Sequence, residues 1–399
     1  MTTFQKVKLG DVCSQITDGK HGDCINNDNS GYYFISSKDV FNGSIHYENA
    51  RQIIEADFLD THRRTKLEIG DILITNSGTI GRMALIKNNT RVEKTTFQKS
   101  VAIIKPKQNV NNTYLFYKLL SLYKQLVNLG GGSAQHNLLL GDLRNFIIQI
   151  PDLPTQTRIA SVLSAYDDLI ENNEKRIKAL EEMAQLLYAE WFVKFKFPLR
   201  LRLEQAGHEK VKMVDSHTEY GMIPEGWEVV KIDNLLKIVK RKIKLQTSEY
   251  KISGQFPIID QGRDFIAGYT DNRELIYSEN LIVFGDHSRC FKYCNFPFAC
   301  GADGTQLLKT NEPERMPQIL LYFSVINAGL QNFNYARHYK FLKELKVILP
   351  NQLIASYFDK IVSSIYEQIK QLRLQNINSG KIRDLLIPQL VTGKRGIKL

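Results

Sequence analysis

The chain has few cysteines and no long apolar run. Its 399 residues include five cysteines, an odd and unevenly spread set that offers no disulfide framework and fits a reducing cytoplasm. The longest apolar runs, such as Ile319–Ile326, have the length of a strand or a core helix and are too short to cross a membrane. The N-terminal residues lack the apolar segment of a secretion signal. We therefore expect a cytoplasmic protein with no membrane partner.

Motifs for methyl transfer and nucleotide hydrolysis are also missing. A methyltransferase needs a Gly-rich turn from a strand into a helix and an Asn/Asp-Pro-Pro-aromatic loop around the base. The sequence has no Pro-Pro dipeptide, and Gly130–Gly132 follows a predicted helix instead of opening one. Gly393-Lys394 continues into an arginine, so it is no Walker-type loop. These absences, and the short chain, disfavour a self-contained nuclease-methyltransferase.

Two groups of residues suggest chemistry but have the wrong spacing for it. Cys290, Cys294 and Cys300 lie near His287, yet Cys-x3-Cys-x5-Cys is not a usual zinc-finger spacing, so we favour buried thiols over a metal site. His287 also has an aspartate and a serine as direct neighbours. Adjacent residues on a strand or tight turn point in different directions, which argues against a catalytic triad. We predict no catalytic and no metal-binding residue.

Positive charge is in clear excess. The net charge is +11 and the pI is near 9.2, which suggests a polyanionic partner, most often nucleic acid. Solvated surface charge remains the alternative for either of the two clusters. The first cluster is Lys194, Lys196, Arg200, Arg202, Lys210 and Lys212, and the second is Lys237, Lys240, Arg241, Lys242, Lys244 and Lys251.

The stretch 155–195 carries a heptad pattern, in which apolar residues recur in alternating steps of four and three. Such a pattern is typical of a helix that packs along a partner helix. Pro154-Thr155 supplies the start, with Thr155 as the expected N-cap. The ladder of positions is Ile159, Leu163, Tyr166, Ile170, Asn173, Ile177, Leu180, Ala184, Leu187 and Trp191.

A second ladder repeats the first one 195 residues later, after Pro350-Asn351. Each ladder has one amide in its middle, Asn173 or Gln368, and a buried amide in such a seam sets the register of the helix pair. Two unrelated amphipathic helices remain the alternative. The second ladder is Ile354, Phe358, Ile361, Ile365, Gln368, Leu372, Gln375, Ser379, Ile382 and Leu386.

The segments before each helix also follow one plan twice. A strand at Asp71–Ile74 recurs at 280–283, a helix at 113–129 recurs at 318–328, and a strand ending at Pro151 recurs at 342–350. We predict an α+β fold: two α/β-mixed domains joined by two long antiparallel coiled-coil helices, related by an internal pseudo-two-fold repeat. The predicted parts are 1–152 (first domain), 153–197 (central helix), 198–222 (linker), 223–349 (second domain) and 350–399 (distal helix and tail).

The two helices agree better between the halves than the two domains do. We infer that the helices have the same role in both halves, whereas the domains act on two different targets. Paired recognition units read DNA half-sites at a separation set by protein geometry. A basic protein with two variable domains on a fixed spacer therefore suits the reading of a split DNA sequence.

Several short motifs, in this order, make the chain resemble the specificity (S) subunit of type I restriction-modification systems over essentially its full length. One departure is Thr155, where this family usually has a glutamate before the glutamine that opens the first helix. The motifs are 17–22 (TDGKHG), 70–73 (GDIL), 78–82 (GTIGR), 154–160 (PTQTRIA), 285–289 (GDHSR), 337–340 (RHYK) and 384–390 (DLLIPQL).

The resemblance implies a non-catalytic subunit with two target recognition domains, each reading one half of a bipartite sequence in double-stranded DNA. The helices would set the unread gap. The chain would hold no cofactor and would dock two modification subunits, which methylate adenine with S-adenosylmethionine. Through them it would dock two restriction subunits that use ATP and Mg²⁺. The rival interpretation is a coiled-coil scaffold that binds DNA only through bulk charge.

Polar loop residues beside strands are the candidates for DNA contact, because Arg or Lys reads guanine, Asn or Gln reads adenine, and hydroxyls and Lys bind phosphate. A structural role in a turn is the alternative for each. The first domain offers Lys20, His21, Asn76, Ser77, Thr79, Arg82, Gln98, Lys99, Ser133 and Gln135. The second offers Arg263, His287, Arg289, Tyr335, Arg337, His338, Tyr339 and Lys340, of which 337–340 form the strongest patch.

Overall fold

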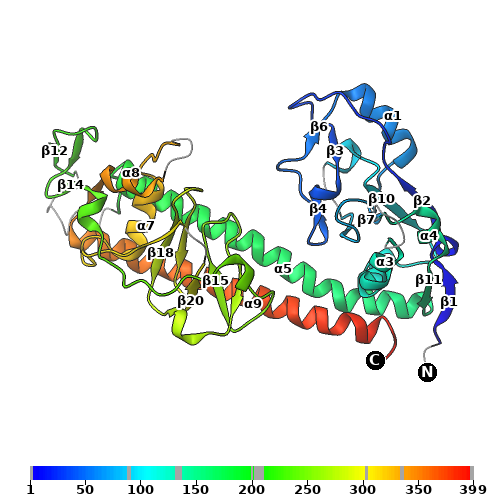
Figure 1. The fold of residues 1–399 in the computed structure, drawn as a ribbon. Helices are drawn as coiled ribbons and strands as arrows, with labels where there is room; N and C mark the ends of the chain where they lie inside the picture. Colours follow the sequence, from blue (N-terminus) through cyan, green and yellow to red (C-terminus); the bar gives the residue numbers. More distant parts are fainter. Residues whose placement is uncertain are drawn as a thin grey trace. The chain divides into compact units, whose positions relative to one another are not determined.

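The computed structural model divides the chain into two compact units (Figure 1). Unit 1 combines Met1–Glu171 with Asn376–Leu399, and unit 2 is Asn172–Gln375. Within the described part of the chain, no helix is long and apolar enough to cross a membrane. The structure describes residues 3–87, 91–130, 137–198, 201, 211–301, 304–332 and 337–395.

Unit 1 is built around a four-stranded antiparallel sheet in the order β2-β10-β7-β8. The strand β1 pairs separately with β11, and a smaller sheet has the order β6-β3-β9. The strands are β1 (Gln5–Lys8), β2 (Cys13–Asp18), β3 (Tyr33–Ile35), β4 (Val40–Phe41), β5 (Ser44–Ile45), β6 (Arg51–Gln52), β7 (Ile72–Thr75), β8 (Met83–Leu85), β9 (Thr95–Phe97), β10 (Val101–Pro106) and β11 (Ile147–Ile150). The helices that lie wholly within Met1–Glu171 are α1 (Glu55–Thr65), α2 (Asn112–Ser121), α3 (Tyr123–Leu129) and α4 (Leu140–Asn145).

The central strands of this sheet are apolar on both faces because a core lies on each side. Ile72 and Ile74 of β7 pack into one cluster with the helix α2, whereas Leu73 points into a second cluster with Val101 and Ile103 of β10. Successive side chains of a strand face opposite sides, so a strand between two cores reads as a continuous apolar run.

Unit 2 repeats this plan. The strand β14 pairs with β22 as β1 pairs with β11, and β18 lies between β19 and β21 as β7 lies between β8 and β10. The strands are β12 (Met213–Asp215), β13 (Met222–Pro224), β14 (Glu228–Lys231), β15 (Phe256–Ile259), β16 (Gly268–Thr270), β17 (Ile276–Tyr277), β18 (Leu281–Gly285), β19 (Phe291–Cys294), β20 (Phe298–Cys300), β21 (Thr305–Leu308) and β22 (Lys346–Leu349). The helices α7 (Gln318–Ile326) and α8 (Tyr339–Glu344) take the places of α2 and α4. The predicted mixed fold with a repeated domain is confirmed.

Two predicted segments differ from the structure. The helix expected over 113–129 is broken at Leu122, whose ψ of 11° ends α2 and begins α3. The stretch 198–222, expected to be a linker, contributes β12 and the first residue of β13 to a two-stranded hairpin.

The long helices are α5 (Leu153–Tyr188), which continues as a π-helical turn over Ala189–Val193, and α9 (Gln352–Leu390). The prediction of Thr155 as N-cap is wrong. Asp152 caps α5 instead, because its carboxylate accepts a hydrogen bond from the amide of Thr155 at 3.0 Å. Hydrogen bonds from the side chain and then the amide of Thr155 lower the pKa of that carboxyl. Asn351 caps α9 in the same way, through the amide of Ile354.

The helices pair antiparallel inside each unit. In unit 1, Asp167 pairs with Arg383 while Asn376 reaches the carbonyl oxygen of Ile170. In unit 2, Glu181 forms an ion pair with Arg373 at 2.8 Å, and Asn173 donates to the side-chain oxygen of Gln375 at 3.1 Å. In each unit the residue numbers rise along α5 while they fall along α9.

The α5 ladder is buried or half-buried throughout, and Asn173 is only 1% exposed. The α9 ladder is partly wrong. Gln368 is exposed, so it is not the buried amide of the seam, and Ile369 is buried in its place. Val362 is likewise buried in place of the exposed Ile361, whereas Ile365 and Leu372 keep their predicted places. Gln375 and Ile382 of the ladder are also exposed.

Candidate nucleic-acid interface

In unit 2, one aspartate joins two of the predicted patches. The strand β18 ends at Gly285, and the next residue, Asp286, is only 3% exposed. Its carboxylate accepts a hydrogen bond from the amide of Tyr339 at 2.7 Å, and its carbonyl oxygen accepts one from the amide of His338 at 3.0 Å. The turn after β18 and the segment 337–340 therefore form one surface.

The ring of His338 packs beneath the exposed residues of this surface and contacts the backbone of Asp286. Its ring is buried, at 2% exposure, and its Nδ1 lies 2.9 Å from the carbonyl oxygen of Asp286. Because a carbonyl oxygen can only accept, Nδ1 carries the proton. The ring is thus turned away from solvent in this structure, and contact between His338 and DNA stays a prediction. His287, Arg337 and Lys340 are exposed.

The remaining candidates of unit 2 lie in different places. Tyr339 is half-buried, as is Arg289, which has a φ of 59° and donates to the carbonyl oxygen of Leu330 at 3.4 Å. Arg263 is exposed and lines a cavity of about 370 Å³ together with Arg373. Residues 287, 289 and 337–340 do not line this cavity. Tyr335 lies outside the described residues.

Unit 1 has a corresponding connection, between the turn after β7 and Leu138. The carbonyl oxygen of Asn76, just after β7, accepts a hydrogen bond from the amide of Leu138 at 2.8 Å. Asn76 thus occupies the place of Asp286, and its side chain is buried, at 8% exposure. The amide thus faces the interior in this structure, and base contact by Asn76 stays a prediction.

The turn over 76–82 depends on two glycines. Gly78 and Gly81 have φ values of 75° and 87°, which favour glycine, and a Cβ on Gly81 would lie 2.7 Å from the ring of Tyr123. The tight turn leaves Thr79 exposed and Ser77 and Arg82 half-buried, so these three stay candidates. Ser133 and Gln135 lie outside the described residues.

The candidates near the start of unit 1 also meet. Lys20 forms a β-bridge with Gln98, and its carbonyl oxygen accepts from the amide of Lys99 at 3.0 Å. The ammonium of Lys20 is paired with Asp57 at 3.1 Å and Asp60 at 3.4 Å. The hydrogen bond to Asp57 raises the pKa of Lys20. Its charge is therefore compensated by α1, whereas Lys99 is exposed.

His21 is the fourth candidate at this edge of unit 1. Its ring is exposed, and Nε2 lies 3.0 Å from a carboxylate oxygen of Asp18.

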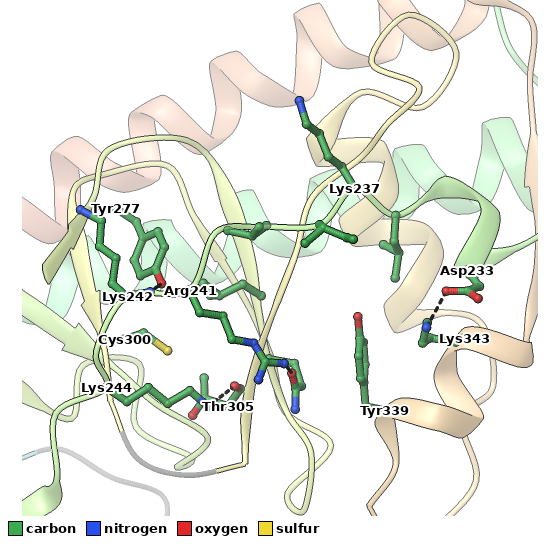
Figure 2. Close-up of a pocket in the computed structure, with 15 residues that line it drawn as sticks. Asp233, Lys237, Arg241, Lys242, Lys244, Tyr277, Cys300, Thr305, Tyr339 and Lys343 are labelled. Atoms are coloured by element: carbon green, nitrogen blue, oxygen red, sulfur yellow. Dashed lines mark hydrogen bonds and ion pairs between the residues drawn. The ribbon is translucent and has the colours of Figure 1, made fainter.

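A further basic surface in unit 2 was not among the predicted site residues. Residues 237–244, which we call the basic strap, run without regular secondary structure past a cavity of about 200 Å³ (Figure 2). Arg241, Lys244 and Tyr339 line this cavity, so the strap adjoins the 337–340 segment. The only signal in the sequence was the concentration of lysine and arginine, which does not distinguish a binding surface from solvated charge.

The metal and triad alternatives have no support in the geometry. Cys294 and Cys300 are buried, and burial raises the pKa of the Cys300 thiol to about 11. Over the described ranges, no three His, Cys, Asp or Glu side chains converge as metal ligands would. The Asp286 carboxylate accepts from the amide of Tyr339, and among the described residues no hydrogen bond joins it to the ring of His287.

Comparison with known proteins identifies the family. Residues 1–182 and 224–375 match the family of the type I restriction modification DNA specificity domain, and the chain belongs to this family. The MjaIX specificity subunit of Methanocaldococcus jannaschii, a type I restriction enzyme subunit, is 29% identical over 352 residues, which cover 82% of this chain and 77% of the relative. The HindI specificity subunit of Haemophilus influenzae is 22% identical over 99% of this chain and its own full length.

A solved structure agrees on the fold. The S subunit of a type I restriction-modification system from M. genitalium superposes with a TM-score of 0.58 at 15% identity, covering 100% of this chain and 97% of that one. The family assignment makes this chain a non-catalytic DNA-specificity protein, so catalysis belongs to other subunits.

Proposed function

We propose that each domain reads one half of a bipartite target in double-stranded DNA and that the paired helices set the unread gap. The observation that carries this proposal is the bond that recurs in both units, from Leu138 to Asn76 and from His338 to Asp286. The same scaffold presents different side chains in each domain. Two domains of one design with different surfaces suit two different half-sites.

Each candidate side chain would act by its chemistry. Arg337 and Lys340 are exposed beside the His287 turn, and a guanidinium or ammonium pairs well with the acceptors of guanine. In the first domain, Thr79 and Lys99 would contribute a hydroxyl and an ammonium to phosphate or base edges. Arg82 and Ser77 would complete that surface.

The chain would work in the cytoplasm as part of a larger complex. It would direct two modification subunits, which methylate adenine with S-adenosylmethionine, and two restriction subunits, which use ATP and Mg²⁺. The chain itself would hold no cofactor, and its contribution would be the choice of sequence and the spacing of the two half-sites.

The decisive experiment is a methylation map. The chain is co-expressed with the modification subunit encoded beside it, and N6-methyladenine is mapped across the host genome at single-base resolution. We expect two short fixed blocks around a constant unread gap. A single continuous block would mean that only one domain reads DNA. No new methylation by an assembled complex with an intact methyltransferase would favour the scaffold alternative.

A further inference from the structure

We infer that the basic strap, residues 237–244, is a clamp for the sugar-phosphate backbone of duplex DNA that adds affinity without reading sequence. This inference rests on the proposed function and names a surface that the predicted site residues did not include. The strap carries five cations in eight residues, which are Lys237, Lys240, Arg241, Lys242 and Lys244.

The first argument is that these charges are not compensated. Across the part of the chain that the structure describes, none of the five cations forms an ion pair with a carboxylate. Neighbouring cations differ in this respect. Lys343, at the same cavity, pairs with Asp233 at 2.7 Å, and Lys309, beside the start of the strap, pairs with Glu279. The strap therefore carries a local surplus of positive charge.

The second argument is that the backbone of the strap is fixed at both ends. Leu236, just before it, forms a β-bridge with Thr310, and Leu245, just after it, forms one with Gly301. In the middle, the amide of Lys242 donates to the hydroxyl of Tyr277 at 2.7 Å. A row of cations on a fixed extended backbone is already ordered for binding, so little conformational entropy is lost when DNA arrives.

The third argument concerns the acceptors that hold the side chains. The ammonium groups of Lys242 and Lys244 donate to backbone carbonyl oxygens, and Arg241 donates to the amide oxygen of Gln306 at 3.0 Å. All of these acceptors are neutral, so each cation keeps its full charge. An ammonium has three donors and a guanidinium has five, which leaves donors for a phosphate oxygen.

The arrangement of the strap matches a backbone rather than a single small anion. Lys237, Arg241 and Tyr339 all line the cavity, and Figure 2 shows the side chain of Lys237 extending away from those of Arg241 and Tyr339. Between the cations, Ile238 and Ile243 are 95% and 78% exposed. The backbone of duplex DNA alternates charged phosphates with apolar deoxyribose edges, so it matches a strap in which isoleucines stand between cations. Tyr339 links the strap to the 337–340 segment, so backbone contact would lie next to base contact.

The test neutralises two cations whose side chains have no role in the fold. Lys237 and Lys240 are exposed, and no side-chain hydrogen bond holds them among the described residues. The variant is Lys237→Gln with Lys240→Gln. The matched control, Arg176→Gln with Lys360→Gln, removes the same charge from exposed positions of unit 2 that lie outside both basic clusters.

Binding of the assembled complex is measured by fluorescence anisotropy from 50 to 300 mM KCl, with a target duplex and a scrambled duplex. Each lost phosphate contact lowers the slope of log affinity against log salt by about 0.9, so we expect the strap variant to lose about 1.8. The slope should fall by the same amount for the target duplex and the scrambled duplex, and the methylated motif should stay the same.

Two outcomes would overturn the inference. A slope equal to that of the control would show that the strap does not contact DNA, and a changed motif would show that it reads bases. Failure of the proposed function looks different, because the wild-type complex would then show no split motif in the methylation map. If the chain is instead a scaffold that binds DNA by bulk charge, the strap variant would still show a smaller slope of log affinity against log salt.

Discussion

The carboxylate of Asp286 accepts a hydrogen bond from the backbone amide of Tyr339, 53 residues further along the chain, at 2.7 Å. Asp286 directly follows the strand β18 and Tyr339 begins the helix α8, so a single side chain joins the turn after β18 to the segment 337–340. The carboxylate also acts as the acceptor that the first turn of α8 lacks, because the residue before this helix makes no side-chain cap of its own.

Asp286→Ala should therefore loosen the second domain's surface and leave the first domain intact. We expect a loss of about 1–2 kcal/mol in the free energy of unfolding, as for a lost helix cap. The methylation map should keep the half-site of one domain and relax the other. Asp286→Asn keeps one acceptor oxygen and serves as the control. Equal relaxation of both half-sites would contradict the assignment of one half-site to each domain.

The core of unit 1 contains a buried ion pair that offers a double-mutant test. The ammonium of Lys105 lies 2.6 Å from the carboxylate of Asp71, and both side chains are nearly buried. Burial raises the pKa of the Asp71 carboxyl, because removing a charge from water outweighs its favourable contacts. Lys105→Met should cost about 3–5 kcal/mol, since it leaves a buried charge without its partner.

The double variant Lys105→Met with Asp71→Leu should recover most of that loss, because replacing both partners removes the uncompensated charge. Urea unfolding of the three variants measures the difference. A double variant as unstable as Lys105→Met alone would mean that the lysine acts through its other contacts, such as the carbonyl oxygen of Lys66 at 2.7 Å.

The thiols should react in two classes. Cys290 is partly exposed, whereas the other four cysteines are buried. Burial raises the pKa of Cys13 to about 12 and that of Cys300 to about 11, so almost no thiolate forms at pH 8. We expect one thiol to react quickly with N-ethylmaleimide, and Cys290→Ser to remove this phase. A chelator that exposed further thiols would favour the zinc alternative over buried thiols.

Lengthening the helices tests the spacer directly. Seven residues are added to α5 between Asn173 and Leu180 and seven to the facing part of α9, between residues 368 and 375. Seven residues extend a helix by about 10 Å and nearly keep its face, which corresponds to about three base pairs. The methylation map should show the same two half-sites with a longer gap. If the bases recognised changed instead, the spacer idea would be wrong.

The sequence predicted the repeated architecture because its signals are local and periodic. The α5 ladder, the Asn351 cap and the apolar strands of both domains depend on residues close in the chain. The exposure of Gln368 could not be predicted, because Ile365 and Ile369 of α9 pack into one core with the second domain, and the periodicity of α9 alone does not show this packing. The α1 helix, with its paired charges to Lys20, also gave no periodic signal strong enough to predict.

The candidate site was predicted less well for a related reason. Whether a polar residue faces solvent depends on contacts distant in sequence, such as the one between His338 and Asp286. That contact buries His338, although the neighbouring Arg337 and Lys340 are exposed. The uncompensated charge of the basic strap likewise becomes visible only when the carboxylates around it are located.

Unit 1 is assembled from both ends of the chain, and this has a consequence for biosynthesis. Ile387, Leu390 and Val391 are buried in its core, and the carbonyl oxygen of Val391 accepts hydrogen bonds from Tyr114 and Lys118, more than 270 residues earlier. A ribosome makes the N-terminal domain first, yet the last turn of α9 completes it. The nascent first domain therefore exposes part of its apolar core until residues 387–391 have been made, so a chain truncated before them would be prone to aggregation.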